Sequence, residues 1–246
     1  MEIRKIFTIS ENKNIAKNVY KMVLLGDTSS FTRPGQFVNI RLEGKYLRRP
    51  ISVCHRDEKS LTLIYKVVGE GTEQMSSMLK GETLDVLVAL GNGFNTDVET
   101  NSPLIVGGGV GVPPMYDVAL ELINRGIKPT VILGFGSREE VFYEEEFKKL
   151  GATVYVTTVN GDYGIKGFVT DAIKEKNIEY DYYFTCGPEP MLKALHTVCT
   201  SQGQLSFEER MGCGFGACMG CSCKTKYGNK RICKDGPILL SGEVIW

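Results

Sequence analysis

The chain has 246 residues, of which 42% are hydrophobic and 24% are charged, values that exclude a disordered, collagenous or coiled-coil chain. Lys and Arg together number 29, as do Asp and Glu, so the neutral chain has no global field that would attract nucleic acid or an anionic membrane. Because no apolar run has the length of a signal peptide or a membrane span, the sequence predicts a soluble, cytoplasmic protein.

Residues 1–98 predict an antiparallel β-barrel. Short runs rich in Val and Ile recur between turn residues, at 3–9, 19–25, 36–42, 61–67 and 84–88. In the fourth run, Leu61, Leu63 and Tyr65 share one face, which is the period of two of a half-buried strand. Strands at this density favour a small closed barrel. We expect a helix at 71–81 and a domain boundary in the polar stretch 95–103.

Residues 99–205 alternate between strand-like and helix-like segments. Strands are expected at 103–108, 130–135, 153–159 and 181–186, and helices at 115–123, 139–150, 168–176 and 189–199. Pro113 and Pro114 suit the first turn of the first of these helices, and Gly126 suits its end. Repeated βα units predict a doubly wound parallel sheet, which binds ligands at the carboxyl ends of its strands.

Residues 206–246 form a third module, rich in Gly and Cys. Five of the eight cysteines lie there, at 213, 218, 221, 223 and 233. In a reducing compartment, clustered cysteines are more often metal ligands or redox groups than disulfides. Cys213, Cys218, Cys221 and Cys233 follow the spacing C-x4-C-x2-C-x11-C, the plant-type pattern for a [2Fe–2S] cluster.

The loop that carries these cysteines contains four glycines, at 212, 214, 216 and 220. Without Cβ atoms, its backbone N–H groups are able to approach the sulfurs and stabilise their negative charge. A zinc ribbon is the alternative, although it prefers two C-x2-C knuckles, and it would make the chain a colourless interaction protein. A thioredoxin-like dithiol at Cys218 and Cys221 lacks the βαβ context of that motif. Cys223 would point away from Cys221 in an extended segment, so we do not expect it to be a ligand.

Three short segments of the predicted barrel have the chemistry of a nucleotide site. They are Arg49-Pro50-Ile51-Ser52, Ile64-Tyr65-Lys66 and Gly71-Thr72. An arginine neutralises a phosphate bidentately, and Gly71-Thr72 at a helix start offers free N–H groups and a hydroxyl to a pyrophosphate. Taken alone, a surface salt bridge and an ordinary helix cap are the favoured explanations of these residues.

The order of these signals resembles the ferredoxin–NADP reductase superfamily, in which an FAD-binding barrel precedes a nicotinamide-binding α/β domain. Arg49 and Ser52 match the R-x-Y-S motif of that barrel, while Ile51 replaces the tyrosine and removes its ring stacking. The resemblance implies that the arginine holds the FAD diphosphate and that the serine approaches the flavin ring.

Two further segments match the nicotinamide domain of this superfamily. Residues 107–113 match its glycine turn, where backbone approaches a dinucleotide, and residues 186–192 match its C-G-P-x-x-M-L motif. The resemblance implies that Gly109 and Gly111 contact NAD, and that Cys186 lies near the nicotinamide C4 and the flavin N5.

One subfamily fits over essentially the whole chain. RRPIS, GEGT and CGFGACMGC in this order resemble the electron-transfer subunits of class B, NAD-dependent dihydroorotate dehydrogenases. The resemblance implies three cofactors, FAD, a [2Fe–2S] cluster and NAD. It places FAD contacts at Arg49, Pro50, Ile51, Ser52, Ile64, Tyr65, Lys66, Gly71 and Thr72, and cluster ligands at Cys213, Cys218, Cys221 and Cys233.

The same resemblance implies an oxidoreductase subunit without a substrate-oxidising site of its own. An FMN-containing catalytic subunit would oxidise dihydroorotate in pyrimidine (UMP) biosynthesis, in a heterotetramer of two subunits of each kind, and electrons would pass through the cluster and FAD to NAD+. The alternative within the superfamily is a reductase subunit of a sulfide, sulfite, hydrogenase or NAD(P)H:ferredoxin system. Trp246 would either stack on the flavin or anchor a subunit interface.

Overall fold

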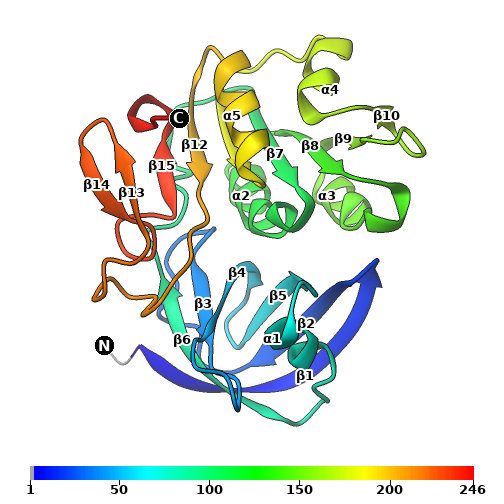
Figure 1. Cartoon of the computed structure of the whole chain (residues 1–246). Helices are drawn as coiled ribbons and strands as arrows, with labels where there is room; N and C mark the ends of the chain where they lie inside the picture. The colour runs from blue at the N-terminus through cyan, green and yellow to red at the C-terminus, as the bar shows by residue number, and fades with distance from the viewer. Residues whose placement is uncertain (1–2) are drawn as a thin grey trace.

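The computed structural model describes residues 3–246. Within this range the chain forms a closed barrel, a seven-stranded sheet and a two-stranded hairpin. Figure 1 shows the barrel below, the sheet with its helices above, and the C-terminal hairpin beside them. The predicted fold class, an antiparallel barrel followed by a doubly wound parallel sheet and a small C-terminal module, is confirmed.

The barrel has the strand order β1-β2-β5-β4-β3-β6. Its strands are β1 (Arg4–Ala16), β2 (Val19–Leu25), β3 (Phe37–Ile40), β4 (Arg49–Arg56), β5 (Ser60–Lys66) and β6 (Thr83–Leu90). Side chains such as Phe7, Met22 and Leu63 fill its interior and are fully buried. The sequence pattern missed β4, because Pro50 and several polar residues interrupt the apolar alternation. Pairing with β3 on one side and β5 on the other makes this segment a strand.

Two helices are shorter than predicted. Helix α1 (Glu70–Ser76) ends early, where the hydroxyls of Ser76 and Ser77 donate to carbonyls of the preceding turn and compete with further helix. Helix α3 (Glu144–Leu150) begins after a 3₁₀ turn at Arg138–Glu140. Tyr143 separates the two with a left-handed φ of 67°, which a continuous helix does not allow.

The seven-stranded sheet has the order β10-β9-β8-β7-β11-β12-β15. Its strands are β7 (Pro103–Gly108), β8 (Thr130–Phe135), β9 (Thr153–Thr158), β10 (Ile165–Lys166), β11 (Tyr182–Cys186), β12 (Gln202–Ser206) and β15 (Ile238–Leu240). All pair in parallel except β15, which runs antiparallel to β12. The C-terminal tail therefore leaves the sheet after β12 and returns to add its last strand, β15. The predicted domain boundaries after residues 98 and 205 stay a prediction.

Helices cover both faces of this sheet. Helix α2 (Val112–Asn124) and α3 pack in one buried cluster with Ile105 and Val131, whereas α4 (Val169–Glu175) and α5 (Glu189–Val198) pack in another with Leu104 and Ile132. Neighbouring residues of each strand thus point to opposite layers, as a doubly wound sheet requires. No helix within residues 3–246 is long and apolar enough to cross a membrane.

The barrel packs against the α2 face of the sheet. Cys54 and Ile64 of the barrel belong to the same buried cluster as α2 and α3. Polar contacts reinforce this interface: His55 Nδ1 lies 2.5 Å from Asp117 Oδ1 of α2. The C-terminal hairpin, β13 (Ser222–Thr225) and β14 (Gly228–Arg231), follows the predicted cluster loop.

Candidate functional site

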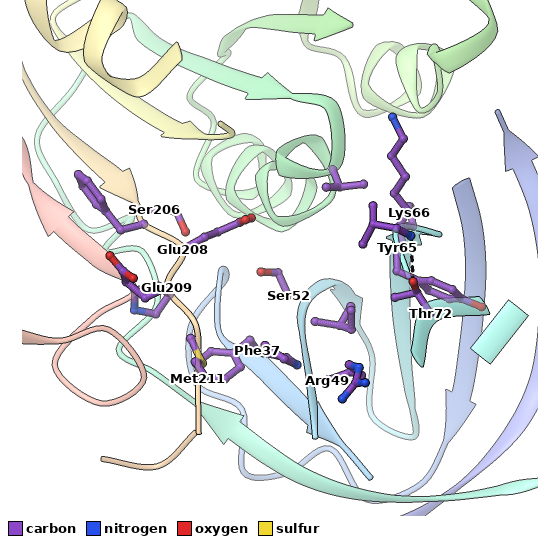
Figure 2. A pocket seen from close by; sticks show the side chains of 17 residues that line it. Phe37, Arg49, Ser52, Tyr65, Lys66, Thr72, Ser206, Glu208, Glu209 and Met211 are labelled. Atoms are coloured by element: carbon purple, nitrogen blue, oxygen red, sulfur yellow. Dashed lines mark hydrogen bonds between the residues drawn. The ribbon is translucent and has the colours of Figure 1, made fainter. Parts of the chain in front are cut away.

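A cavity of about 320 Å³ lies between the barrel and the α/β sheet, and we call it the interdomain cavity. Figure 2 shows side chains pointing into it from β3, β4 and β5 on one side and from the segment after β12 on the other. Of the residues that the resemblance assigns to FAD, all but Gly71 line it: Arg49, Pro50, Ile51, Ser52, Ile64, Tyr65, Lys66 and Thr72. The fold thus gathers three separate sequence segments around one space.

Gly71 lies against the side chain of Arg49. A Cβ at position 71 would overlap the Arg49 guanidinium, which lies across the first turn of α1. The Thr72 hydroxyl accepts hydrogen bonds from the backbone N–H groups of Val68 and Gly69 and donates to the Gly69 carbonyl. A fixed cation at the edge of the cavity is suited to a diphosphate.

Lys66 connects the cavity to the α/β part. Its Nζ lies 2.7 Å from Glu140 Oε1, and the hydrogen bond from Lys66 lowers the pKa of the Glu140 carboxyl. Tyr65 is nearly buried, and its hydroxyl donates to Asn12 Oδ1 at 3.0 Å. The lysine therefore bridges two parts of the chain, while the tyrosine mainly supports the cavity wall.

The far wall of the cavity comes from the glycine turn and from residues around the end of β12, which no motif indicated. Val110 of the glycine turn lines it, together with Ser206, Phe207, Glu208, Glu209 and Met211. Although Glu208 reaches solvent, desolvation by the surrounding protein raises the pKa of its carboxyl. Phe207, Glu208 and Glu209 directly follow β12, so their position at the carboxyl end of a strand was the signal available in the sequence. The same segment leads directly to Cys213.

The glycine turn lies against the end of β11. A Cβ on Gly111 would collide with the backbone carbonyl of Cys186, so only glycine permits this approach. Cys186 is 2% exposed, and burial raises the pKa of its thiol to about 12. Its sulfur is therefore a neutral thiol near pH 7. Neither Gly111 nor Cys186 lines the interdomain cavity; together they hold the turn in place.

Gly109 does line a cavity, a second one of about 510 Å³ at the carboxyl ends of β7, β8 and β9. Gly108, Gly134 and Gly136 also line it, and Gly109 has a left-handed φ of 52°. Exposed backbone at the carboxyl ends of parallel strands is typical of a dinucleotide site. The structure thus separates the three predicted NAD contacts into one cavity residue and two residues behind it.

The four motif cysteines form two pairs. The Cys213 N–H donates to Cys218 Sγ at 3.5 Å, and the Cys233 N–H donates to Cys221 Sγ at 3.4 Å. Cys221 and Cys233 belong to one buried cluster and Cys213 packs against it, so the two pairs lie near each other. Burial and the nearby Cys221 sulfur raise the pKa of the Cys233 thiol. Within residues 3–246, no three His, Cys, Asp or Glu side chains converge to hold a single metal ion.

Backbone donors surround the first pair. Burial raises the pKa of Cys213, but N–H groups of Cys218, Phe215 and Ala217 together lower it to about 6. The Ala217 N–H lies 3.2 Å from Cys213 Sγ. Two irons that share bridging sulfides need four thiolates, and two pairs of sulfurs with N–H donors match that need. The donor set therefore fits a [2Fe–2S] cluster.

Cys223 and Trp246 do not line the interdomain cavity. They line a third cavity of about 350 Å³ beside the start of α5. Trp246 packs on Phe207, with ring centroids 5.6 Å apart, and on His196 at 5.8 Å. The terminal tryptophan thus supports Phe207, which lines the interdomain cavity, without lining that cavity itself.

Sequence comparisons agree with this arrangement. The oxidoreductase NAD-binding domain matches residues 105–197, and the iron-sulfur cluster binding domain of dihydroorotate dehydrogenase B matches residues 208–245. A dihydroorotate dehydrogenase B (NAD(+)) electron transfer subunit from Fusobacterium nucleatum subsp. nucleatum is 49% identical over 96% of each chain. A protein of the same name from a Geobacillus species is 45% identical over 97% of each chain.

Solved structures share the fold. A chain of the NADH-dependent reduced ferredoxin-NADP oxidoreductase matches with a TM-score of 0.88 and 32% identity, over 98% of this chain and 90% of that one. The FAD/NAD binding domain of a nitric oxide dioxygenase from Vibrio cholerae matches in fold alone, with a TM-score of 0.66 and 21% identity over 78% of this chain and 90% of that one. Given the near-complete coverage by the curated relatives, the chain belongs to the family of dihydroorotate dehydrogenase B (NAD(+)) electron transfer subunits.

Proposed function

We propose that this oxidoreductase subunit passes electrons from an FMN-containing, dihydroorotate-oxidising partner to NAD+, by way of a [2Fe–2S] cluster on Cys213, Cys218, Cys221 and Cys233 and FAD in the interdomain cavity. One observation carries the proposal. The barrel, the glycine turn and the segment that enters the cysteine loop all contribute walls to the same cavity. A cofactor there is adjacent to both an NAD site and a cluster site.

The chemistry of the bound groups explains why three are needed. A flavin exchanges two electrons with nicotinamide as a hydride and single electrons with an iron–sulfur cluster. The protein supplies position and charge. In this proposal Arg49 neutralises the diphosphate, Ser52 approaches the ring, and Val110 places the glycine turn over the cavity.

NAD binding follows the same logic. Gly109 and the neighbouring glycines leave backbone exposed at the sheet edge, where a dinucleotide is able to approach closely. Gly111 and Cys186 hold that turn rigidly. The buried thiol of Cys186 stays protonated near pH 7, so it contributes shape and not charge to the place where nicotinamide meets the flavin.

The partner follows from the family. An electron transfer subunit implies a catalytic subunit, and we propose the heterotetramer of two subunits of each kind in the cytoplasm, serving pyrimidine (UMP) biosynthesis. The relatives' printed name supports the catalytic partner. Dihydroorotate oxidation would then take place on that partner, and this chain would transfer the electrons to NAD+.

Co-expression with the FMN-containing subunit tests the proposal. The purified complex should contain FAD and iron, give the low-temperature EPR signal of a reduced [2Fe–2S] cluster, and reduce NAD+ when given dihydroorotate. The catalytic subunit alone is the control and should not reduce NAD+. Zinc in place of iron, or a complex without FAD, would overturn the assignment.

A second candidate function has a specific observation in its favour. The chain is 32% identical to a chain of the NADH-dependent reduced ferredoxin-NADP oxidoreductase over nearly its whole length. A subunit of such a system would exchange electrons with ferredoxin. Reduction of NAD+ by reduced ferredoxin, but not by dihydroorotate with the FMN-containing subunit, would favour this candidate.

A further inference from the structure

Asn39 on β3 is a buried amide without a hydrogen-bond partner. Its residue is 1% exposed, and neither its side-chain Nδ2 nor its Oδ1 has a partner within the described part of the chain. Most buried polar groups are paired, because an unpaired one loses its hydration without replacement. An orphaned amide in the middle of a four-residue strand therefore needs an explanation.

The amide points at the cysteine loop. A Cβ built on Gly214 would collide with Asn39 Nδ2, so the amide lies directly against the backbone that follows Cys213. Gly214 has a left-handed φ of 79°, which suits glycine on conformational grounds as well. The barrel thus presents a hydrogen-bond donor to the segment on which the cluster would be built.

The backbone of Asn39 is held between two strands, and the burial of its side chain keeps the amide away from solvent. Asn39 pairs with Pro50 of β4 and Leu87 of β6, and its carbonyl accepts a hydrogen bond from Arg48 at 3.3 Å. Phe37, two residues earlier on the same face of β3, lines the interdomain cavity and packs in the same buried cluster as Cys221 and Cys233. Strand β3 therefore links the two sites.

We propose that Asn39 is a positioning residue whose side-chain N–H donates a hydrogen bond to a sulfur of the [2Fe–2S] cluster and so stabilises the reduced cluster. This inference rests on the proposed function. A reduced cluster carries one more negative charge than an oxidised one, so a donor aimed at its sulfur favours reduction, and hydrogen bonds to sulfur are among the determinants of cluster potential. No motif indicated Asn39, because it lies in the barrel, far along the chain from the cysteines.

The test uses the full chain with its cofactors, purified without oxygen. Asn39→Leu keeps the approximate size of the side chain and removes the donor. In an EPR-monitored redox titration, the equilibrium constant for cluster reduction should fall about tenfold, which is about 59 mV for one electron. Thr185→Val is the matched control, because it removes another buried, unpaired polar group, on β11, and should leave the potential unchanged.

A spectroscopic readout separates a hydrogen bond from a packing role. With 15N-labelled asparagine, ENDOR of the reduced wild-type cluster should show a nitrogen coupling and an exchangeable proton that Asn39→Leu lacks. Absence of that coupling in the wild type overturns the inference, even if the variant fails to fold. Asn39→Asp, which keeps the shape and replaces the N–H group by oxygen, should also lower the potential.

The possible failures are distinguishable. If wild-type protein gives a [2Fe–2S] signal but both Asn39 variants keep its potential, this inference is wrong and the proposed function stands. If wild-type protein takes up no iron, the proposed function is wrong. A shifted potential with the nitrogen coupling still present in Asn39→Leu would also contradict the role of Asn39.

Discussion

The interdomain cavity and the cysteine loop are built in opposite ways. The cavity takes its lining from side chains on three barrel strands, on α1, on the glycine turn and on the segment after β12. The cysteine loop is one contiguous segment, residues 212–221, whose backbone N–H groups approach the sulfurs and which Cys233 completes. One site depends on rigid elements that meet in space, and the other depends on spacing within a short stretch of backbone.

This difference teaches which changes each site tolerates. A cluster on a contiguous loop needs every one of its ligands, because no neighbouring element replaces a lost one. An assembled cavity loses affinity in steps, since each wall contributes separately. The following substitutions test that contrast, from the largest expected effect to the smallest.

Cys221→Ser should abolish the cluster and spare the flavin. Cys221 is 1% exposed and pairs with Cys233, so its loss removes one of the four proposed thiolates. Iron analysis and EPR should show almost no [2Fe–2S] cluster, while FAD stays near one per chain. Cys223→Ser is the control and should keep both. Loss of FAD together with iron in Cys221→Ser would show that the two sites do not assemble separately.

Gly111→Ala should destabilise the α/β part. The added Cβ meets the backbone carbonyl of Cys186, so the backbone itself has to shift, and overpacking of this kind costs about 1–3 kcal/mol. Chemical unfolding should show that loss in the free energy of unfolding, with weaker NADH binding in calorimetry. Gly242→Ala, where a Cβ meets nothing within 4 Å, should be neutral. Wild-type stability in the Gly111→Ala variant would contradict the close packing.

Gly71→Ala should weaken FAD alone. The new Cβ displaces the Arg49 guanidinium, and loss of one hydrogen bond to a charged group corresponds to about tenfold in affinity. Fluorescence titration of flavin-free protein measures the dissociation constant. At Gly69, φ is 177° and a Cβ would have open space, so Gly69→Ala serves as the control. Equal FAD affinity in both variants would show that Arg49 does not contribute to FAD binding.

The smallest effect concerns the contact between the barrel and α2. The hydrogen bond to Asp117 raises the pKa of His55, against the opposing effect of burial; the charge of Asp57 adds to the increase and that of Arg56 opposes it. Since the folded pKa is raised, the stabilisation is complete below about pH 6.5, the unfolded value, and is lost as pH rises through the folded pKa.

Because a third of the His55 side chain is exposed, the contribution should stay below about 1 kcal/mol, or about 2–4 °C in melting temperature. Thermal melts of wild type and His55→Asn between pH 5.5 and 8.5 measure it. The difference between the two proteins should shrink with rising pH. A constant difference across this range would mean that protonation of His55 does not strengthen the interface.

The sequence itself determined the parts whose signals are local. The cysteine spacing and its glycines indicated a cluster loop, and the alternation of βα units predicted the doubly wound sheet, because both patterns lie within a few turns of chain. Resemblance to a reductase superfamily then pointed to Arg49, Ser52 and Lys66, whose types alone fit ordinary surface roles as well.

Only the tertiary structure decided the parts that depend on contacts between distant segments. Strand β4 exists because β3 and β5 pair with it, β15 returns to complete the sheet, and Glu208 reaches the interdomain cavity from the far side. Asn39 becomes a candidate donor to the cluster only because Gly214 packs against its side chain. The physical reason is that burial and hydrogen-bond satisfaction are properties of assembled surfaces, and no short stretch of sequence carries them.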